Sequence, residues 1–538
     1  MPQTRRTFLQ QASAFTLLSS PVCTFAQQSM HDHMASPASQ PPTPGPQPTL
    51  LRASTLAPFV DPLPLPVRLT PGHRKLRIAM RETHATIHRD LPPTRFWTYT
   101  EASNPNPSAL APLIEARTHQ PLQIEWINQL PTQHFLPIDH SLHGCGTDIP
   151  DVRAVTHLHG ARVPSKDDGY PTDWFPSGQS RTCTYPLQQD AAALWYHDHA
   201  MGINRLNTYA GLFGMVLLRD HTEDALNLPA GPYEIPLTLY DRDFTPDAQL
   251  AYPTSGDPDH PWVPEFYADA ILVNGKIRPY LEVEPRLYRL RILNAANSRF
   301  FSLALSNGQP LHVIGSDQGL LSEPVNLKTL LLSPAERTDI LIDLSAYAGQ
   351  KLHLLNSSTE ILELRVSASA KSPSAARIPT TLRTITPTPE SSAIVTRTIT
   401  LAEHDDKIGN PMVMLINRKH WHEPVTETPR LNTTEIWEFV TLTEDTHPMH
   451  LHLVRFQVLD RRVFEPYSFN MLKKMKYLSP AVPPEPFERG WKDIVQCPPA
   501  MVTRIIVKFE GYAGNYLYHC HVLEHEANDM MRPFEVVA

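Results

Sequence analysis

The 538-residue chain has few cysteines, few charged side chains and no long hydrophobic run. Five cysteines are too few for a scaffold held together by disulfides. Charged residues make up 19% of the chain, below the usual ~25%, and the formal net charge is −8. That charge argues against binding to nucleic acid or to an anionic membrane surface. No segment after the N-terminus approaches ~20 uninterrupted apolar residues, so we expect no membrane partner for the mature chain.

Proline and histidine are present in excess. The 55 prolines are roughly one residue in ten, about twice ordinary usage, and proline cannot donate hydrogen bonds within helices or central strands. The composition therefore disfavours a helical protein, while ordinary aliphatic and aromatic content disfavours wholesale disorder. At ~100–200 residues per domain, the length predicts roughly three domains. The 26 histidines have no such general explanation, so we examined where they lie.

The N-terminus has the pattern of an export signal. Arg5 and Arg6 precede a short apolar stretch from Ala12 to Leu18, and Thr24-Phe25-Ala26 is a plausible cleavage site. The paired arginines before Phe-Leu resemble the twin-arginine type, a route that carries folded proteins with their cofactors already loaded. An ordinary secretory signal with a chance arginine pair is the alternative. We predict that residues 1–26 are removed and that the protein is periplasmic or secreted.

The rest of the chain reads as all-β. Short runs rich in β-branched and aliphatic residues, such as Leu122–Trp126, Ile235–Leu239 and Arg504–Phe509, recur between turn signals and predict stacked β-sandwiches. Stretches rich in Pro, Ser, Thr or Gln separate them. The predicted organisation is a tether with an extended lead-in (27–65), a first domain (66–220), a second domain (221–366), a linker (367–392) and a third domain (393–538).

Four short segments hold most of the candidate chemistry, and each contains a His-x-His pair. Side chains alternate along a strand, so the two imidazoles of each pair lie on one face and form a metal clamp. One such pair is weak evidence, but four in one chain are hard to explain by packing. The segments are His157-Leu158-His159, His197-Asp198-His199, His447-Pro448-Met449-His450-Leu451-His452 and His519-Cys520-His521.

The last segment indicates copper. On a strand, Cys520 points away from its two histidine neighbours, so this tripeptide can reach two metal sites. A thiolate, two imidazoles and a weak axial thioether form a blue-copper site, and Cys520, His525 and Met530 supply three of these ligands. His447 is the candidate for the second imidazole. The other eight clustered histidines then face a polynuclear site: His157, His159, His197, His199, His450, His452, His519 and His521.

This arrangement resembles the multicopper oxidases. The closest resemblance is to the branch of bacterial spore-coat laccases and bilirubin oxidases, and it covers most of the chain after about residue 60. It is carried by Trp195–Gly211 (WYHDHAMGINRLNTYAG), Val273–Pro285 (VNGKIRPYLEVEP), Ala335–Asp343 (AERTDILID) and His519–Pro533 (HCHVLEHEANDMMRP). The resemblance implies three cupredoxin domains, a mononuclear type 1 copper in the third, and a trinuclear cluster between the first and the third.

The resemblance also implies which residue binds which of the four coppers. It assigns His447, Cys520, His525 and Met530 to type 1 copper, and His157 and His450 to type 2 copper. It assigns His159, His197 and His521 to one type 3 copper, and His199, His452 and His519 to the other. Every ligand position is filled, which argues against the family's non-catalytic members.

Two acidic residues are candidates for proton delivery. Reducing dioxygen to water consumes four protons, so a titratable group near the cluster is needed. Glu526 follows His525, and Asp168 lies eleven residues after His157; both match acids that serve this purpose in the branch. A structural hydrogen bond, or a turn-forming Asp before Gly, is the alternative for each.

Three other cysteines, Cys145, Cys183 and Cys497, can form at most one disulfide or remain buried thiols.

The resemblance implies a laccase-like enzyme. Phenols, aromatic amines or a tetrapyrrole such as bilirubin would give up single electrons near His525, and Cys520 would pass them to His519 and His521 for reduction of O2 to water. A metallo-oxidase acting on Cu(I), Fe(II) or Mn(II) for metal tolerance is the nearest alternative. A copper-binding scaffold with vestigial turnover is a second. We expect a monomer whose partners are a small aromatic reductant and O2.

Overall fold

A computed structural model describes residues 49–257, 260–371, 376–405 and 411–538. The predicted export signal (1–26) and most of the predicted tether lie outside the described residues. Within these ranges strands dominate and the longest helices have seven residues, and the prediction of an all-β fold is confirmed. None of the helices in the described ranges combines the length and hydropathy needed to cross a bilayer.

The first sandwich consists of two packed sheets. Their inner faces bury aromatic rings at alternate strand positions, with Tyr99, Trp126 and Tyr196 in mutual contact at centroid distances of 5.1–5.4 Å. One sheet has the order β1 (Arg68–Leu69), β4 (Leu113–Arg117), β11 (Phe213–Arg219), β10 (Ala192–Asp198), β7 (Thr156–His159). The other has the order β3 (Thr94–Glu101), β2 (Leu76–Ala85), β5 (Leu122–Asn128), β9 (Ser180–Tyr185), and β6 (Arg153–Ala154) pairs with β8 (Phe175–Pro176) nearby.

The second sandwich is the largest. One sheet has the order β15 (Lys276–Ile277), β14 (Ala270–Val273), β12 (Glu234–Phe244), β17 (Leu287–Asn294), β22 (Arg337–Asp343), β19 (Leu311–Ser316), β20 (Gly319–Leu327), and β13 (Leu250–Ala251) pairs with β12. The facing sheet has the order β16 (Tyr280–Val283), β24 (Thr359–Val366), β23 (Lys351–Asn356), β18 (Phe301–Leu305), β21 (Leu330–Leu332). Every residue of β17 is buried, as expected for a central strand covered on both faces.

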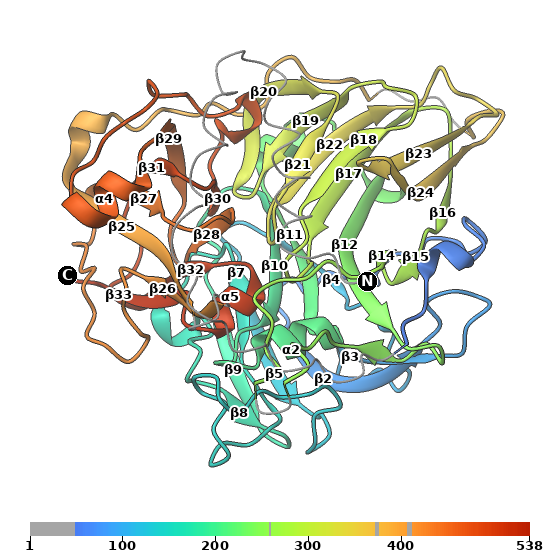
Figure 1. The fold of residues 1–538 in the computed structure, drawn as a ribbon. Helices are drawn as coiled ribbons and strands as arrows, with labels where there is room; N and C mark the ends of the chain where they lie inside the picture. Colours follow the sequence, from blue (N-terminus) through green and yellow to red (C-terminus); the bar gives the residue numbers. More distant parts are fainter. Residues whose placement is uncertain (1–48, 258–259, 372–375, 406–410) are drawn as a thin grey trace, which may run out of the picture.

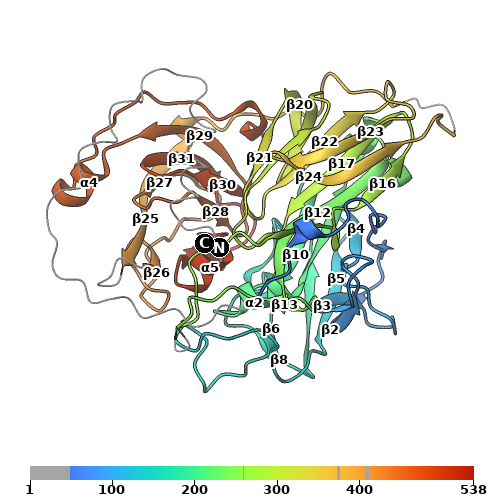
Figure 2. The ribbon, with the colours of Figure 1, turned by 45° about the vertical axis from the view of Figure 1, so that its right-hand side comes forward.

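The third sandwich ends the chain. Trp437 fills its core against Phe509, Tyr518 and Phe534. One sheet has the order β26 (Pro411–Ile416), β25 (Ala393–Asp405), β27 (Thr434–Thr441), β31 (Met501–Lys508), β29 (Phe456–Val463). The other has the order β30 (Ile494–Cys497), β28 (His447–Leu451), β32 (Gly514–Cys520), β33 (Met531–Val536). Figures 1 and 2 show each sandwich in contact with the other two.

Short helices connect the strands. The α-helices in the described part of the chain are α2 (Asn204–Ala210), α3 (His221–Ala225), α4 (Pro466–Leu472) and α5 (Leu523–Ala527). The 3-10 turns are η1 (Ala53–Thr55), η2 (Ser165–Asp167), η3 (Gly231–Tyr233), η4 (Glu390–Ser392) and η5 (Pro486–Glu488). Helices α2 and α5 lie beside each other, which joins the first and third sandwiches next to the histidine-rich strands.

The segments on either side of the sandwiches are held by hydrogen bonds. Before β1, Leu51 donates to Phe244 and Leu63 donates to Tyr280, so this lead-in lies along the second sandwich. After β24, Leu382 donates to Ser322 of β20, and Arg383 forms ion pairs with Asp190 and Asp220 of the first sandwich. Both segments therefore contribute contacts between domains.

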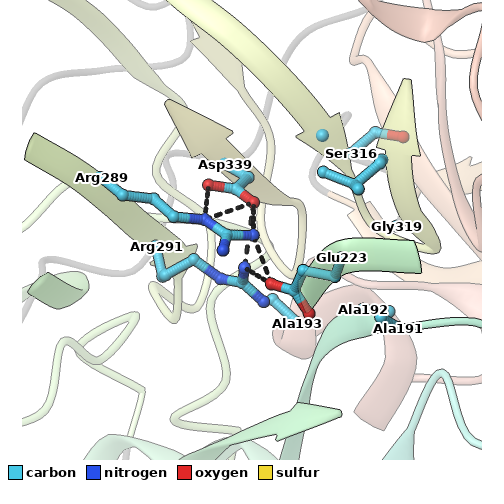
Figure 3. Close-up of a pocket in the computed structure, with 11 residues that line it drawn as sticks. Ala191, Ala192, Ala193, Glu223, Arg289, Arg291, Ser316, Gly319 and Asp339 are labelled. Atoms are coloured by element: carbon cyan, nitrogen blue, oxygen red, sulfur yellow. Dashed lines mark hydrogen bonds and ion pairs between the residues drawn. The ribbon is translucent and has the colours of Figure 1, made fainter. Parts of the chain in front are cut away.

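A buried network of charges joins the first and second sandwiches. Glu223 on α3 meets two arginines of β17, and Asp339 on β22 contacts the same two (Figure 3). The cavity among them holds about 10 Å³, roughly one water. Burial alone would raise the pKa of the Glu223 and Glu234 carboxyls, but the guanidiniums around them lower both to about 2. The network comprises Arg219, Glu223, Glu234, Arg289, Arg291 and Asp339.

This network predicts acid sensitivity. The pKa of Glu234 is about 2 in the folded chain against an ordinary 4.5, so its contribution to stability is present above pH 4.5 and is lost as the pH falls toward 2. At 1.36 kcal/mol per unit, the contribution is at most about 3 kcal/mol. We expect Glu234→Gln to lower the melting temperature at neutral pH and to flatten its fall between about pH 5 and pH 3. Differential scanning calorimetry measures this, with Glu282→Gln, at a glutamate whose side chain is 69% exposed, as the control. An unchanged acid profile in Glu234→Gln would contradict the prediction.

Candidate metal centres

Two pairs of adjacent strands bring the four histidine segments together. In the first sandwich β7 and β10 are antiparallel neighbours, with His157 opposite His197. In the third, β28 and β32 are antiparallel neighbours, with His450 opposite His519. Figure 1 shows these four strands near the centre of the molecule, where the two sandwiches meet. The His-x-His spacing places imidazoles on one face of each strand, and the contact between the domains turns those faces toward each other.

Eight imidazoles form one buried cluster at this contact. Pairs from opposite domains stack closely: His157 on His452 with ring centroids 3.9 Å apart, and His159 on His450 at 3.7 Å. The Nε2 atom of His519 lies 3.4 Å from that of His199 and 3.2 Å from that of His452. No member exposes more than 1% of its surface. The cluster contains His157, His159, His197, His199, His450, His452, His519 and His521, all of the histidines predicted for the polynuclear site.

The orientation of these rings fits metal binding. Four of them are held at Nδ1 by backbone carbonyl oxygens: His519 by Cys520 at 3.1 Å, and three others, namely His157 by Asp168 at 2.6 Å, His197 by Asp198 at 2.9 Å, and His450 by Asp493 at 2.8 Å. In His157, His197 and His450 the Nε2 atom is buried without a hydrogen-bond partner among the described residues. A ligating histidine is held in the same way, with one nitrogen fixed by an acceptor and the other left for the metal.

The imidazoles are also in the charge state that a metal needs. Burial, followed by the proximity of other imidazoles or Arg337, holds the pKa of seven of the eight well below the usual range. These seven are His157, His159, His197, His199, His450, His452 and His521. They are therefore neutral at physiological pH, and a neutral imidazole keeps a lone pair for a cation.

A second buried cluster lies in the third sandwich. The Sγ atom of Cys520 is 3.5 Å from Nδ1 of His447 and 3.7 Å from Nδ1 of His525, and the two nitrogens are 3.2 Å apart. Met530 is fully buried, and its carbonyl oxygen accepts a hydrogen bond from the Cys520 amide. Burial raises the pKa of the Cys520 thiol, so a thiolate at this position needs a bound cation. The donor set, one sulfur with two imidazoles, is that of a blue-copper site.

The two predicted acids lie against the eight-histidine cluster. A carboxylate oxygen of Glu526 on α5 is 3.2 Å from Nδ1 of His519, and the other accepts a hydrogen bond from Asn204 at 2.5 Å. A carboxylate oxygen of Asp168 is 2.7 Å from Nδ1 of His452, and burial raises the pKa of this carboxyl well above its ordinary value. Both acids thus contact imidazoles of the cluster.

Other residues at these centres were not found from the sequence. Asp493 lies 3.1 Å from Nε2 of His159 and accepts hydrogen bonds from Arg337 and Gln318 of the second sandwich. Glu265, also from the second domain, has a carboxylate oxygen 3.4 Å from Nε2 of His525. Arg337 lies in the stretch 335–343 that carries the family resemblance, but no spacing identified either acid.

The cysteines in the described residues are all thiols without disulfide partners. Cys145, Cys183, Cys497 and Cys520 are each buried. Of the two alternatives left open by the sequence, the structure therefore shows Cys145, Cys183 and Cys497 as buried thiols.

Family models match three successive parts of the chain. Residues 94–223, 241–363 and 388–538 each match a model described as multicopper oxidase. This chain belongs to the multicopper oxidase family. The predictions of this family and of three cupredoxin-like domains are confirmed.

Individual relatives agree with this assignment. The chain is 43% identical to a laccase of Bacillus subtilis over 90% of its own length and 99% of the relative. It is 35% identical to multicopper oxidase LPR1 homolog 1 of rice (Oryza sativa subsp. japonica) over 93% and 96% of the two chains. The crystal structure of a laccase from Pediococcus acidilactici superimposes with a TM-score of 0.73 at 27% identity, over 90% of this chain and 95% of that one.

The family implies four copper ions: one of type 1, one of type 2 and two of type 3. The two clusters described above fit these ions, because they offer a thiol with two imidazoles and a separate set of eight imidazoles. The enzyme is a laccase-like copper oxidoreductase that uses O2 as its electron acceptor.

Proposed function

We propose that this oxidase is a laccase acting on small aromatic reductants, namely phenols, aromatic amines or a tetrapyrrole such as bilirubin. The observation that carries the proposal is the pairing of a complete thiol–imidazole cluster with a complete eight-imidazole cluster through one tripeptide, His519-Cys520-His521. The 43% sequence identity to the Bacillus subtilis laccase, over 90% of this chain and 99% of the relative, supports the same activity.

We assign the ligands from the two clusters and the family pattern. Bound copper supplies one-electron oxidation of the donor at the mononuclear centre and reduction of O2 at the trinuclear centre. Type 1 copper would be held by His447, Cys520, His525 and Met530, and type 2 copper by His157 and His450. One type 3 copper would be held by His159, His197 and His521, and the other by His199, His452 and His519. Because Cys520 is covalently joined to a ligand on each side, the chain provides a short path between the centres.

Glu526 and Asp168 are proposed to hold and deliver protons at the trinuclear centre. Both are buried carboxyls in contact with its imidazoles, and O2 reduction consumes protons there. We expect Glu526→Gln, which keeps the hydrogen bond from Asn204 but cannot exchange a proton, to slow turnover by about 100-fold or more. Under steady-state oxidation the type 1 colour should then stay bleached, because reoxidation by O2 becomes limiting.

Glu524→Gln is the matched control for that variant. Glu524 is also a buried acid on α5, but its carboxylate accepts hydrogen bonds from Tyr252, Asn297 and Ser298 and from none of the described imidazoles. Stopped-flow absorption during turnover separates the two variants. Equal rates and equal colour in Glu526→Gln and the wild type would remove Glu526 from proton delivery.

The donor is expected to give its electron at the His525 edge. The outer nitrogen of this imidazole lies beside the carboxylate of Glu265, a side chain that is 14% exposed. That acidic group also favours a second candidate function, a metallo-oxidase for Cu(I), Fe(II) or Mn(II), since a metal-ion donor needs such a ligand beside the type 1 centre.

A donor panel distinguishes the candidates. With an oxygen electrode and copper quantitation, a laccase should show a larger kcat/KM for phenols and aromatic amines than for the metal ions. Glu265→Gln sharpens the comparison, because a metallo-oxidase should lose mainly metal-ion oxidation. A preference for metal ions that disappears in Glu265→Gln would favour the metallo-oxidase, and no oxygen uptake with any donor by copper-loaded protein would favour a scaffold.

We also propose that the protein is exported through the twin-arginine route and works as a monomer. Arg5-Arg6 before Phe8-Leu9 supports the route. Replacing both arginines by lysine should leave the protein unprocessed inside the cell, as cell fractionation would show. Light scattering of the purified protein tests the monomer.

A further inference from the structure

Outside the copper centres, one other group of histidines gathers around a carboxylate. Nδ1 of His143 is 3.2 Å from one oxygen of Asp529, and Nδ1 of His420 is 2.6 Å from the other. His422 completes the group, with its ring centroid 5.7 Å from that of His420 and 6.0 Å from that of His143. These four residues, His143, His420, His422 and Asp529, are called the outer histidine group below.

The group is built from three segments of two domains. His143 lies in the first domain, in the loop between β5 and β6, whereas His420 and His422 follow β26 in the third. Asp529 immediately precedes Met530, the proposed axial ligand of type 1 copper. The side chains of His143 and His420 are 35% and 45% exposed, so ions in solution can reach them.

The ring spacing matches that of the copper centres of this same chain. Imidazoles that we assign to one copper have centroids 5.1–5.9 Å apart. The two spacings in the outer histidine group are 5.7 Å, within this range, and 6.0 Å, just above it. The spacing therefore permits one shared ion, and Asp529 links His143 to His420 through its two oxygens.

The carboxylate of Asp529 orients an imidazole in the same way as a carboxylate beside the proposed copper ligands. Asp168 holds Nδ1 of His452 at 2.7 Å, much as Asp529 holds Nδ1 of His420 at 2.6 Å. A neutral imidazole that donates from Nδ1 keeps its lone pair on Nε2, the arrangement common in metal-ligating histidines. Direct ligation by Asp529 is also within reach. Bonds of about 2.1 Å at tetrahedral or right angles separate ligand atoms by about 3.0–3.4 Å, which includes the His143 distance.

We propose that the outer histidine group is an additional site for a divalent transition-metal ion, which clamps the first domain to the third beside the type 1 centre. Three imidazoles and a carboxylate suit Zn(II), Cu(II) or Ni(II). An ion bound only by the folded chain raises its stability, and here it ties together segments separated by almost 400 residues in sequence. Binding at this site does not depend on catalytic turnover or on which reductant the enzyme oxidises.

Zn(II) is the probe, added to copper-loaded full-length protein. Isothermal titration calorimetry should show one Zn(II) bound per chain, while mass spectrometry of the metals shows the four coppers retained. The melting temperature should rise with Zn(II). In a variant carrying His420→Ala and His422→Ala, we expect the affinity to fall by at least about 100-fold, since even indirect contacts to a metal contribute 10–100-fold.

Two controls separate this site from other histidines. His312→Ala removes a single imidazole that contacts Asn326, and it should keep the bound Zn(II). A variant with His31→Ala and His33→Ala, two residues outside the described ranges, should also keep it. His143→Gln tests the first-domain contribution without relying on the double variant, and it too should lose Zn(II).

Zinc K-edge absorption spectroscopy gives the ligands directly. Outer-shell scattering from imidazoles with nitrogen and oxygen in the first shell is the expected result. Sulfur in the first shell, loss of copper on adding Zn(II), unchanged affinity in the variants, or no Zn(II) bound by the wild type would each overturn the proposal. The last of these would leave the group as a hydrogen-bonded contact between domains only.

Discussion

Replacing Cys520 by serine is expected to abolish the blue colour and donor oxidation together. The colour of such a site depends on the copper–thiolate bond, and a serine hydroxyl is neither soft nor ionised at neutral pH. The Cys520 thiol is fully buried between His447 and His525, so the serine hydroxyl would occupy the same position beside the two imidazoles. Because residues that only support a ligand contribute 10–100-fold, we expect a loss of more than about 100-fold in kcat/KM.

Copper content makes this result specific. The eight-imidazole cluster lies outside the substitution, so the Cys520→Ser variant should keep about three of four coppers. Cys183→Ser is the matched control, since Cys183 is also a buried free thiol but lies on β9, in the other sheet of the first sandwich. It should remain blue and active. A blue, active Cys520→Ser protein would refute the assignment of Cys520.

The placement of neighbouring ligands within one strand could be predicted, because the direction of each side chain depends only on its position along the strand. Alternation along a strand was enough to place His519 and His521 on one face and Cys520 on the other. The same rule identified His-x-His pairs but not their partners, because the pairing of β7 with β10 and of β28 with β32 depends on contacts between distant segments. The family resemblance supplied that information.

Residues that support the ligands could not be predicted in this way. Glu265 reaches His525 from another domain, and no pattern in the residues around it distinguishes it from other glutamates. The pair His420-x-His422 has a recognisable pattern, but the rule for strands does not apply to it. It has the spacing of the copper segments, yet it follows β26 in a loop, where alternation along a strand does not apply, and its contacts with Asp529 and His143 join distant parts of the chain.

Asp493 is the supporting residue whose loss is expected to have the largest effect. One of its oxygens fixes Nε2 of His159, its carbonyl oxygen fixes Nδ1 of His450, and Arg337 forms two hydrogen bonds with its carboxylate. Asp493→Asn removes the charge that orients His159 and balances a fully buried guanidinium. Substitution of a residue that orients a ligand typically reduces metal affinity or activity by 10–100-fold, and we expect a loss of that size in trinuclear copper affinity and in the rate of O2 reduction.

The difficulty is that Asp493→Asn also breaks a buried ion pair, which by itself can destabilise a protein by 3–5 kcal/mol. Asp339→Asn provides the comparison, because Asp339 is likewise buried against Arg289 and Arg291 but forms no hydrogen bond or ion pair with a described histidine. Both variants should melt at lower temperature. Only Asp493→Asn should lose trinuclear copper and O2 reduction while keeping the type 1 colour, because His447, Cys520 and His525 do not contact it in the structure. If the two variants keep equal copper and equal rates, Asp493 only stabilises the fold. If only Asp493→Asn loses them, Asp493, which Arg337 of the second domain holds in place, positions the trinuclear ligands without being one.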